Sequence, residues 1–384
     1  MQINQAIIMT SAGLRATWAE VNLARLKSNL QAIRKMVAPA KVMLVVKANA
    51  YGHGLAEVSK AMAPLADYIG VAVLEEGILL REMGISEPII VLGGIWGDQI
   101  PQYLQYHLTL TASSVERLER LNEAAGEKGV KAKVHLKIDT GMERIGVHYY
   151  SAETLQEAAL KCRNVEVEGI YSHFANADSV DLTHARLQME RFNEVLCFYE
   201  RHSLPMPLRH MANSAAVLQL PESYFDMVRP GILFYGVYPS PDVAHTIAVR
   251  PALVWKSRVV YFKVVRPGHP VSYGSTWQSD HPVRVVTVPV GYGDGYFRRM
   301  SNQAWVIIRG KKYSQVGRIC MDQMMINIEN DSAYNGDEVV LLGESGDQKV
   351  LAEDLAEWAG TIPYEILTNI NTRVPRIYTS EEKD

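Results

Sequence analysis

The chain has few cysteines and no large excess of either charge. Its three cysteines, Cys162, Cys197 and Cys320, are odd in number and lie far apart in a chain of 384 residues. This usage is typical of a reducing compartment and argues against a disulfide framework or a zinc site. The formal net charge is −3, and acidic and basic residues are interspersed. The sequence therefore offers no charged surface of the kind that binds nucleic acid.

Long apolar runs are also lacking. No run reaches ten residues, so no segment is long enough to cross a membrane. The first ten residues, Met-Gln-Ile-Asn-Gln-Ala-Ile-Ile-Met-Thr, have no basic stretch before their short apolar patch, which argues against a secretory signal. We therefore expect a cytoplasmic protein. Hydrophobic residues still make up 48% of the chain, and its length exceeds that of one ordinary domain.

Strand-like and helix-like segments alternate up to about residue 248. Amphipathic segments such as 115–128, 151–162 and 185–202 are predicted helices between short apolar segments. Eight such units favour a parallel (β/α)8 barrel, of the TIM type, and an open doubly wound sheet is the alternative. The predicted strands are 42–47, 68–73, 88–92, 107–111, 133–138, 166–173, 208–211 and 225–228.

The pattern changes after this point, where strands follow one another without helices between them. Turn signals separate them at 266–270, 309–312 and 334–337. We predict two domains, a barrel over 1–248 and a mostly antiparallel, β-rich domain over 249–384, with one helix at 351–359. The predicted strands of the second domain are 249–258, 259–265, 283–290, 304–309, 324–328 and 338–342.

Lys47 is the most informative single residue. It ends the apolar run 41–46, which is typical of a buried parallel strand, and the glycine-broken stretch Lys47-Ala-Asn-Ala-Tyr51-Gly-His-Gly54 leads from it into a helix at Leu55. Burial disfavours an ammonium ion and lowers the pKa of a lysine. A neutral amine in a dry pocket suits Schiff-base chemistry with a carbonyl cofactor. The alternative is a lysine whose charged end reaches solvent.

Other polar residues follow the barrel strands, where barrels carry their chemistry. Ser214 stands at a predicted helix N-terminus, and Gly231 and Ile232 offer backbone N–H groups, so the three together suggest a phosphate site. The alternatives are a helix cap and a turn.

Two cationic side chains carry further hypotheses. If Arg229 faces the ring nitrogen of a pyridine cofactor, that nitrogen stays unprotonated, which favours proton exchange over transamination. From the sequence alone, an ordinary salt bridge is the better interpretation of Arg229. Lys137 alternates with His135 and Asp139 along the fifth strand, where a second cation, Arg144, is also near. Like charges there cost energy unless one is neutralised, and pairing with Asp139 is the plain alternative.

The second half offers motifs without a clear chemical role. These are the Ser-Tyr-Gly around Tyr273, the Cys-Met-Asp-Gln around Met321, and the Pro-Tyr-Glu around Tyr364. The stretch Gly291-Tyr-Gly-Asp-Gly295 lacks the spacing of a nucleotide loop, and we interpret it as a turn. Composition alone makes none of these residues catalytic.

Taken in order, these motifs resemble the bacterial alanine racemases along essentially the whole chain. The resemblance implies a (β/α)8 barrel, a β-rich second domain, pyridoxal 5'-phosphate as cofactor and a homodimer with shared active sites. It implies interconversion of L-alanine and D-alanine by two bases. The matching motifs are Val-Val-Lys-Ala-Asn-Ala-Tyr-Gly-His-Gly, Lys-Ile-Asp-Thr-Gly-Met, Ser-His-Phe-Ala, Asn-Ser-Ala-Ala, Val-Arg-Pro-Gly-Ile, Ser-Tyr-Gly, Gly-Tyr-Gly-Asp-Gly-Tyr and Cys-Met-Asp-Gln.

Residue by residue, the resemblance implies that Lys47 holds the cofactor as an imine and exchanges the proton of the D-enantiomer. Tyr273, from the partner chain, serves the L-enantiomer. Arg229 matches the partner of the ring nitrogen, with His173 linked to it. The matching phosphate contacts are Tyr51, Ser214, Gly231, Ile232 and Tyr364, the matching substrate contacts are Arg144 and the backbone of Met321, and the supporting residues are Asp322 and Lys137, a lysine commonly carbamylated in the family.

The sequence is also compatible with two alternative functions. A different pyridoxal enzyme on the same barrel, such as a decarboxylase or a broad-specificity racemase, is disfavoured by Arg229 and by the lack of a signal. A non-catalytic carrier of pyridoxal phosphate is disfavoured by the second domain, which carries Tyr273. The sequence leaves open whether the D-alanine is a peptidoglycan precursor or the enzyme serves alanine breakdown.

Overall fold

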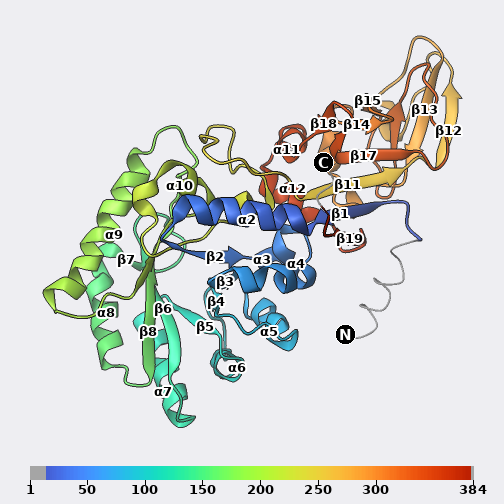
Figure 1. The fold of residues 1–384 in the computed structure, drawn as a ribbon. Helices are drawn as coiled ribbons and strands as arrows, with labels where there is room; N and C mark the ends of the chain where they lie inside the picture. Colours follow the sequence, from blue (N-terminus) through green and yellow to red (C-terminus); the bar gives the residue numbers. More distant parts are fainter. Residues whose placement is uncertain (1–13, 382–384) are drawn as a thin grey trace. The chain divides into compact units, whose positions relative to one another are not determined.

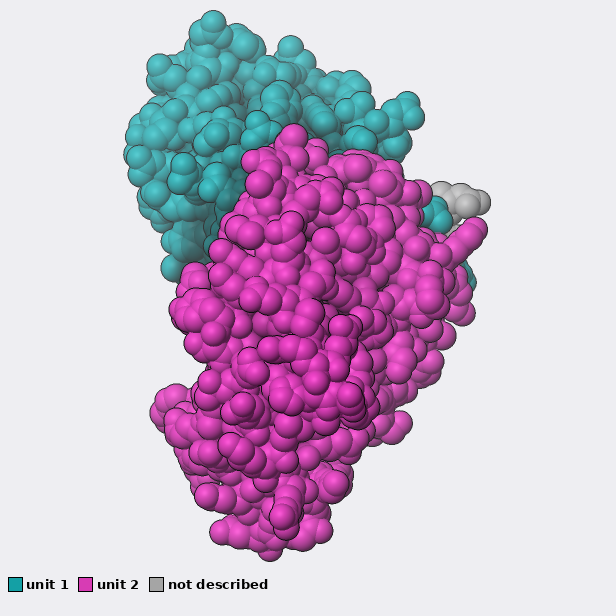
Figure 2. All heavy atoms as spheres, turned by 90° about the vertical axis from the view of Figure 1, so that its left-hand side faces the viewer, with its two compact units in different colours: residues 1–26, 51–54, 250–384 teal, residues 27–50, 55–249 magenta. Residues whose placement is uncertain are grey.

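The computed structural model describes residues 14–381, so the expectation about the first ten residues lies outside the described range. The chain divides into two compact units, coloured separately in Figure 2. Among the described residues, one contains 27–50 and 55–249, and the other contains 14–26, 51–54 and 250–381. The first is called the barrel unit below and the second the β unit.

The barrel unit is built on a closed parallel sheet. Its strands pair in the order β5-β4-β3-β2-β10-β9-β8-β6, and β5 also pairs with β6, which closes the ring; the short strand β7 (Val147–His148) pairs outside it. The predicted barrel is therefore confirmed, and the open sheet is wrong. The barrel strands are β2 (Lys41–Val45), β3 (Tyr68–Val71), β4 (Ile89–Val91), β5 (Thr109–Ala112), β6 (Ala132–Asp139), β8 (Val165–Tyr171), β9 (Leu208–His210) and β10 (Met227–Val228).

Helices lie along the outside of these strands (Figure 1). Helix α7 shows why they form: Ser114 caps it by accepting the N–H of Arg117, and Leu118, Leu121 and Ala125 bury one face. The helices of this region are α2 (Leu23–Val37), which crosses the division between the units, α4 (Leu55–Met62), α5 (Leu74–Glu82), α6 (Ile100–Gln105), α7 (Val115–Glu127), α8 (Ala152–Lys161), α9 (Thr183–Arg201) and α10 (Ser214–Gln219).

The β unit contains a sheet of ten strands, paired in the order β12-β13-β16-β15-β14-β17-β11-β1-β19, with β18 beside β17. Its pairings are antiparallel except that between β1 and β19. The elements are β1 (Trp18–Asn22), β11 (Leu253–Arg258), β12 (Tyr261–Val265), β13 (Val283–Val288), β14 (Trp305–Ile308), β15 (Lys311–Val316), β16 (Met324–Asn327), β17 (Glu338–Ser345), β18 (Gln348–Val350), β19 (Arg376–Thr379), α11 (Ala352–Ala359) and α12 (Pro363–Asn369).

The structure differs from the prediction in several elements. Strands β1, β15, β18 and β19 and helix α12 were not predicted. Strand β1 pairs with β19, from the other end of the chain, and the sequence gives no sign of so distant a partner. Strand β15 begins with two lysines, so it lacks an apolar run. Of the helices between residues 14 and 381, none is long and apolar enough to span a membrane. The domain boundary at 248/249 stays a prediction.

Candidate active site

Lys47 was predicted to end the first barrel strand. In the structure it instead begins a turn after that strand. Strand β2 ends at Val45, and α3 (Lys47–Tyr51) follows. Within α3 the φ angles of Ala48, Asn49, Ala50 and Tyr51 are 53°, 56°, 51° and 50°, so the turn is left-handed. This conformation costs roughly 1–2 kcal/mol per residue for side chains of this kind. Backbone strain of this kind is typical of functional sites, where the surroundings hold it in place.

Side chains from the barrel unit fix this strained turn. One oxygen of the Glu76 carboxylate accepts the N–H of Ala48 at 2.6 Å, and the other accepts the N–H of Ala72 at 2.8 Å. The side chain of Asn49 accepts the N–H of Leu55 at 2.8 Å, at the start of α4. The turn is thus tied to two helix starts, which holds Lys47 in a defined position.

Lys47 is partly buried among other cations. Burial lowers the pKa of its amine, Arg144 and Arg229 lower it further, and the Glu76 carboxylate opposes them. The neutral amine is the nucleophilic form of a lysine, so this environment favours covalent chemistry with a carbonyl group.

Arg229 lies almost fully buried among neutral acceptors. It is 4% exposed, and burial lowers its pKa to about 10, so the guanidinium is still charged at neutral pH. Among residues 14–381 it forms no ion pair, so the salt-bridge interpretation does not hold there. Its partners are Ser172 O at 2.7 Å, Met211 O at 3.1 Å, His210 Nδ1 at 2.7 Å and His173 Nδ1 at 3.2 Å.

The hydrogen bond from Arg229 also determines which ring nitrogen of His173 carries the proton. A guanidinium can only donate, so Nδ1 of His173 accepts and its proton lies on Nε2. Burial, followed by Arg229, Lys137, Arg144 and Lys47, holds the pKa of His173 well below its usual value. His173 is therefore a neutral imidazole with an N–H to donate.

Lys137 is buried beside the same cations, with 3% of its surface exposed. Its ammonium donates to Ile138 O at 2.9 Å, and burial, with Arg229 and Arg144, lowers its pKa to about 7 against the opposing charge of Asp139. The Asp139 carboxylate instead accepts the N–H groups of Gly141 and Arg144, so the structure does not give the direct pair of Lys137 with Asp139.

Ser214 and Gly231 meet directly. Asn213 caps α10, because its side chain accepts the N–H of Ala216 at 3.0 Å, and Ser214 is the first helical residue. The buried Ser214 hydroxyl accepts the N–H of Gly231 at 2.8 Å and that of Leu233 at 3.3 Å. The N–H of Gly231 was predicted to be free for a phosphate, but it is donated to the Ser214 hydroxyl. The proton of that hydroxyl stays available for an anion.

The remaining predicted residues belong to the β unit. Tyr51 is 6% exposed, and its ring lies 6.2 Å from that of Tyr364 on α12. A Cβ on Gly52 would come within 2.0 Å of Leu367 O, so only glycine lets the chain pack this closely on α12. The side chain of Arg376 donates to Gly52 O at 3.0 Å. Tyr51 and Tyr364 are therefore held side by side.

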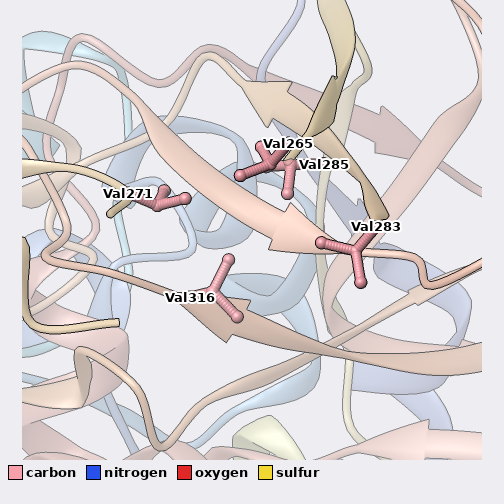
Figure 3. Close-up of a cluster of buried hydrophobic side chains, with 5 residues drawn as sticks. All are labelled: Val265, Val271, Val283, Val285 and Val316. Carbon is pink, nitrogen blue, oxygen red and sulfur yellow. The ribbon is translucent and has the colours of Figure 1, made fainter. Parts of the chain in front are cut away.

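Tyr273 begins a short 3-10 turn and is 70% exposed. The Ser272 hydroxyl before it donates to Arg318 O at 2.6 Å. Figure 3 shows what anchors this turn: Val271 belongs to a buried cluster with Val265, Val283, Val285 and Val316. The apolar cluster holds the turn and leaves the tyrosine ring in the open.

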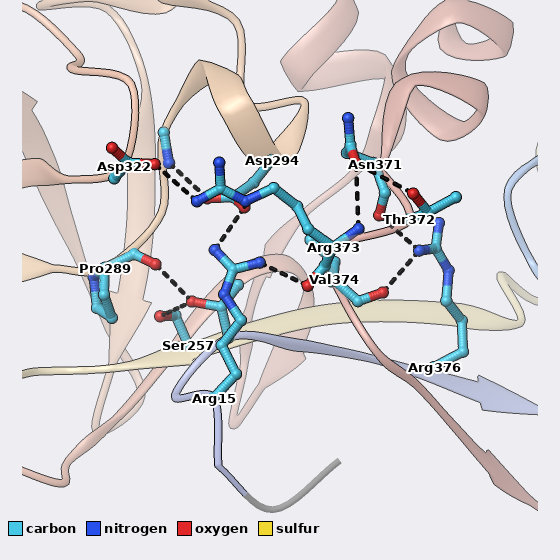
Figure 4. Close-up of polar contacts among 12 residues, drawn as sticks. Arg15, Ser257, Pro289, Asp294, Asp322, Asn371, Thr372, Arg373, Val374 and Arg376 are labelled. Atoms are coloured by element: carbon cyan, nitrogen blue, oxygen red, sulfur yellow. Dashed lines mark hydrogen bonds and ion pairs between the residues drawn. The ribbon is translucent and has the colours of Figure 1, made fainter. Parts of the chain in front are cut away.

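The loop that carries Met321 and Asp322 is clamped by arginines (Figure 4). Arg373 binds the buried carboxylate of Asp294 at 2.9 Å and that of Asp322 at 2.6 Å. Arg15 also pairs with Asp294. Gly293 donates its N–H to Met321 O at 2.8 Å, so the glycine-rich turn interpreted as a plain turn also supports the loop.

Comparison with known proteins agrees with this geometry. Residues 21–239 match the alanine racemase N-terminal domain and residues 252–378 match the C-terminal domain. The chain belongs to the alanine racemase family. The alanine racemase of Carboxydothermus hydrogenoformans is 47% identical over 375 residues, which cover 95% of this chain and all of that one.

Solved structures of alanine racemases agree as well. One from Bacillus anthracis, with bound L-Ala-P, is 34% identical and has a TM-score of 0.90, covering 96% of each chain. One from Bartonella henselae, described with covalently bound pyridoxal phosphate, is 27% identical and has a TM-score of 0.86, covering 95% of this chain and 99% of that one.

The structure thus places the predicted residues of this alanine racemase family member in two groups. The barrel unit contains Lys47, Lys137, Arg144, His173, Ser214, Arg229, Gly231 and Ile232, and the β unit contains Tyr51, Tyr273, Met321, Asp322 and Tyr364. The sequence analysis missed Glu76, Asp294 and Arg373. A charged residue in a sequence does not indicate which distant residue it binds in the fold. No group of His, Cys, Asp and Glu side chains within residues 14–381 is arranged to hold a metal ion.

Proposed function

We propose that this protein interconverts L-alanine and D-alanine with pyridoxal 5'-phosphate as cofactor. The observation that carries the proposal is Lys47, which stands in a strained turn with its pKa lowered by burial and by Arg144 and Arg229. Membership of the alanine racemase family supports the same function.

The residues present fit the cofactor. Arg144 and Arg229 bring positive charge to the region of Lys47 and Lys137, which suits an anion such as a phosphate or a carboxylate. The Ser214 hydroxyl offers a proton to a phosphate oxygen. Arg229 has only neutral acceptors around it, so it suits an unprotonated ring nitrogen.

When bound, the cofactor supplies an electron sink that acidifies the α-proton of alanine. Lys47 would hold it and would move a proton at its Nζ on one face of the substrate. A second base must act on the opposite face, because a proton leaves one face and another returns to the other. We assign this role to the phenolic oxygen of Tyr273, with Arg144 and the N–H of Met321 binding the substrate carboxylate.

We propose a homodimer in which the partner's Tyr273 completes the site. The exposed fractions support it: Tyr273 is 70% exposed and Met321 is 52% exposed, which is high for groups that bind a substrate in a dry site. A closed twofold dimer would cover both residues and give two equal sites. The neutral His173, with its Nε2–H, would then stabilise the phenolate of the partner's Tyr273.

We also propose that the protein works in the cytoplasm. Cys162, Cys197 and Cys320 are all free thiols, which fits a reducing compartment.

Purified protein loaded with cofactor should convert either enantiomer of alanine to the racemate. Polarimetry would follow this as a loss of optical rotation. The same assay with other amino acids distinguishes a broad-specificity racemase, and carbon dioxide release identifies a decarboxylase. Loaded protein that leaves both enantiomers of alanine unchanged would contradict the proposal and favour a carrier.

A further inference from the structure

A chain of hydrogen-bonded polar side chains leads away from Arg229 through the barrel unit. It consists of the buried Arg229, His210 on β9 and His135 on β6 and the partly buried Glu168 on β8, and it is called the relay below. Arg229 lies 2.7 Å from His210 Nδ1, His210 Nε2 lies 2.7 Å from His135 Nδ1, and His135 Nε2 lies 3.3 Å from Glu168 Oε2. Both histidines have no exposed surface.

The hydrogen bonds of the relay run in one direction only. A guanidinium cannot accept, so His210 Nδ1 accepts from Arg229 and its proton lies on Nε2. That proton is donated to His135 Nδ1, so the proton of His135 also lies on Nε2 and is donated to Glu168. One obligate donor thereby fixes the tautomer of both rings.

The charges at the two ends agree with this direction. Burial opposes the charge of Glu168, but hydrogen bonds from His135 and Lys133 lower its pKa to about 2, so it is an anion that accepts. Burial and the charge of Arg229 hold the pKa of His210 well below its usual value, so the ring is neutral. Each bond polarises the next, which strengthens the acceptor that Arg229 meets.

The packing around the relay leaves little freedom. A Cβ on Gly169 would lie 2.6 Å from His135 Nδ1, so the missing side chain makes room for that ring. The ring of Tyr171 stacks on His210 at 4.6 Å with 7° between the planes, and the guanidinium of Arg229 lies 5.2 Å from the same ring. The rings can therefore neither turn nor shift easily.

We propose that His210, His135 and Glu168 are positioning residues that fix the orientation of Arg229 and thereby hold racemisation apart from transamination. The role of Arg229 toward the ring nitrogen rests on the proposed function. A guanidinium held rigidly keeps that nitrogen unprotonated. A looser one lets it take up a proton, which makes the ring a stronger electron sink and favours transamination, in which alanine becomes pyruvate and its amino group stays on the cofactor.

The first test reads the tautomers directly and needs no turnover. Holoenzyme with 15N-labelled histidine should show His135 and His210 as neutral rings protonated on Nε2, assigned through the variants His135→Asn and His210→Asn. A proton on Nδ1 of His210, or a charged ring at neutral pH, would overturn the relay whatever the enzyme catalyses.

The second test counts racemisation turnovers for each pyruvate formed. Glu168→Gln keeps the shape and the acceptor but removes the charge. His135→Asn keeps an acceptor for His210 in place of Nδ1 but loses the ring nitrogen Nε2, which reaches Glu168 in the wild type. We expect both variants to lower kcat about tenfold with little change in KM, and to lower the number of turnovers per pyruvate about fivefold. Glu166→Gln is the matched control, because Glu166 lies exposed on the same strand.

The outcomes separate the two proposals. Folded, cofactor-loaded variants with the wild-type kcat and turnovers per pyruvate would overturn the relay. A lower yield of folded protein with an unchanged ratio would also overturn it, because the residues would then serve only the fold. If the wild type does not racemise alanine, the proposed function fails, while the tautomers still decide the relay.

Discussion

The two predicted bases stand in opposite surroundings. Lys47 lies in a strained turn, partly buried, with Arg144, Arg229 and Glu76 acting on its pKa. Tyr273 lies on a turn of the β unit with 70% of its surface exposed. The barrel unit lowers the pKa of Lys47 by burial and by two arginines, whereas the β unit leaves Tyr273 exposed.

This difference suggests how the work is divided. The barrel unit holds a buried guanidinium, a neutral imidazole with a free N–H and an excess of cations, which together would stabilise a phenolate. The β unit contributes rigid supports: the valine cluster under Tyr273 and the arginine clamp under Met321. A tyrosine that acts as a base therefore needs surroundings that its own unit does not provide.

The largest effect should come from Lys47→Ala. The variant should lose the visible absorption of the bound cofactor, and racemisation should fall by about 1,000-fold or more, because the substitution removes the amine that would bind the cofactor. Spectra and polarimetry of the purified variant measure both.

Lys60→Ala is the control, since Lys60 lies exposed on α4 beside Glu57. It should keep the wild-type spectrum and rate. A Lys47→Ala protein that still forms an imine reducible by borohydride and turns over alanine would remove Lys47 from the comparison.

The second prediction concerns the division between the units. Lys47→Ala and Tyr273→Phe should each be nearly inactive and should complement each other when their chains are exchanged. At equal mixing about half of the dimers are mixed, and each holds one intact site, so about a quarter of the wild-type activity should return.

Wild-type chains taken through the same exchange provide the control and should keep their activity. If mixed dimers verified by mass spectrometry stay inactive, the two residues act within one chain. The exposure of Tyr273 would then need another explanation.

Much of the fold could be predicted from the sequence. Barrel strands such as β4, and β2 after its first residue, are continuous apolar runs, as expected of buried parallel strands, and all eight barrel strands were predicted within a few residues of their observed bounds. Strands β1 and β19 were missed because each finds a partner only when residues near 19 meet residues near 376. The left-handed turn after Lys47 was missed as well, since three of its four residues, Ala48, Ala50 and Tyr51, are types that seldom adopt a positive φ.

The candidate site, too, could be predicted only in part. Residues such as Ser214 and His173 could be named because they follow strands or match motifs. Their supports could not be named, because the partners of the relay are 19, 75 and 33 residues apart in sequence. Only Gly169, a glycine inside a strand, signalled a close approach, and a sequence alone does not say what approaches it.

The third prediction compares the partly buried carboxylate of Glu168 in the barrel unit with an exposed carboxylate in the β unit. The pKa of Glu168 is lowered to about 2 in the folded chain, below its unfolded value of about 4.3, so its charge stabilises the fold above the unfolded value. The shift corresponds to about 3 kcal/mol before screening. Because solvent partly screens this half-buried carboxylate, Glu168→Gln should cost on the order of 2 kcal/mol of the free energy of unfolding at neutral pH. The gap to the wild type should narrow as the pH falls from about 4.3 towards about 2.

Urea unfolding at several pH values measures this gap. Asp331→Asn is the control from the β unit: hydrogen bonds from Tyr313 and Lys311 lower the pKa of Asp331 too, but solvent screens it, so its effect should be much smaller. A gap for Glu168→Gln that stays constant down to pH 3 would mean that the lost stability does not come from the charge.

The smallest effect should come from the arginine clamp of the β unit. Arg373→Gln removes the link between the buried Asp294 and the exposed Asp322, while Arg15 still pairs with Asp294. The loop of Met321 should loosen, and its N–H should bind the substrate carboxylate less well. Because both enantiomers carry that carboxylate, KM should rise about threefold to tenfold for each, with little change in kcat.

Arg309→Gln is the matched control, because Arg309 forms an exposed pair with Asp337 in the same unit. It should leave KM unchanged, as exposed pairs contribute only about 0–1 kcal/mol. If Arg373→Gln lowers kcat through a loss of folded protein and leaves KM alone, the clamp stabilises the unit without positioning Met321. If KM rises for one enantiomer only, the loop contacts a group other than the carboxylate, and the β unit would then take part in telling the two enantiomers apart.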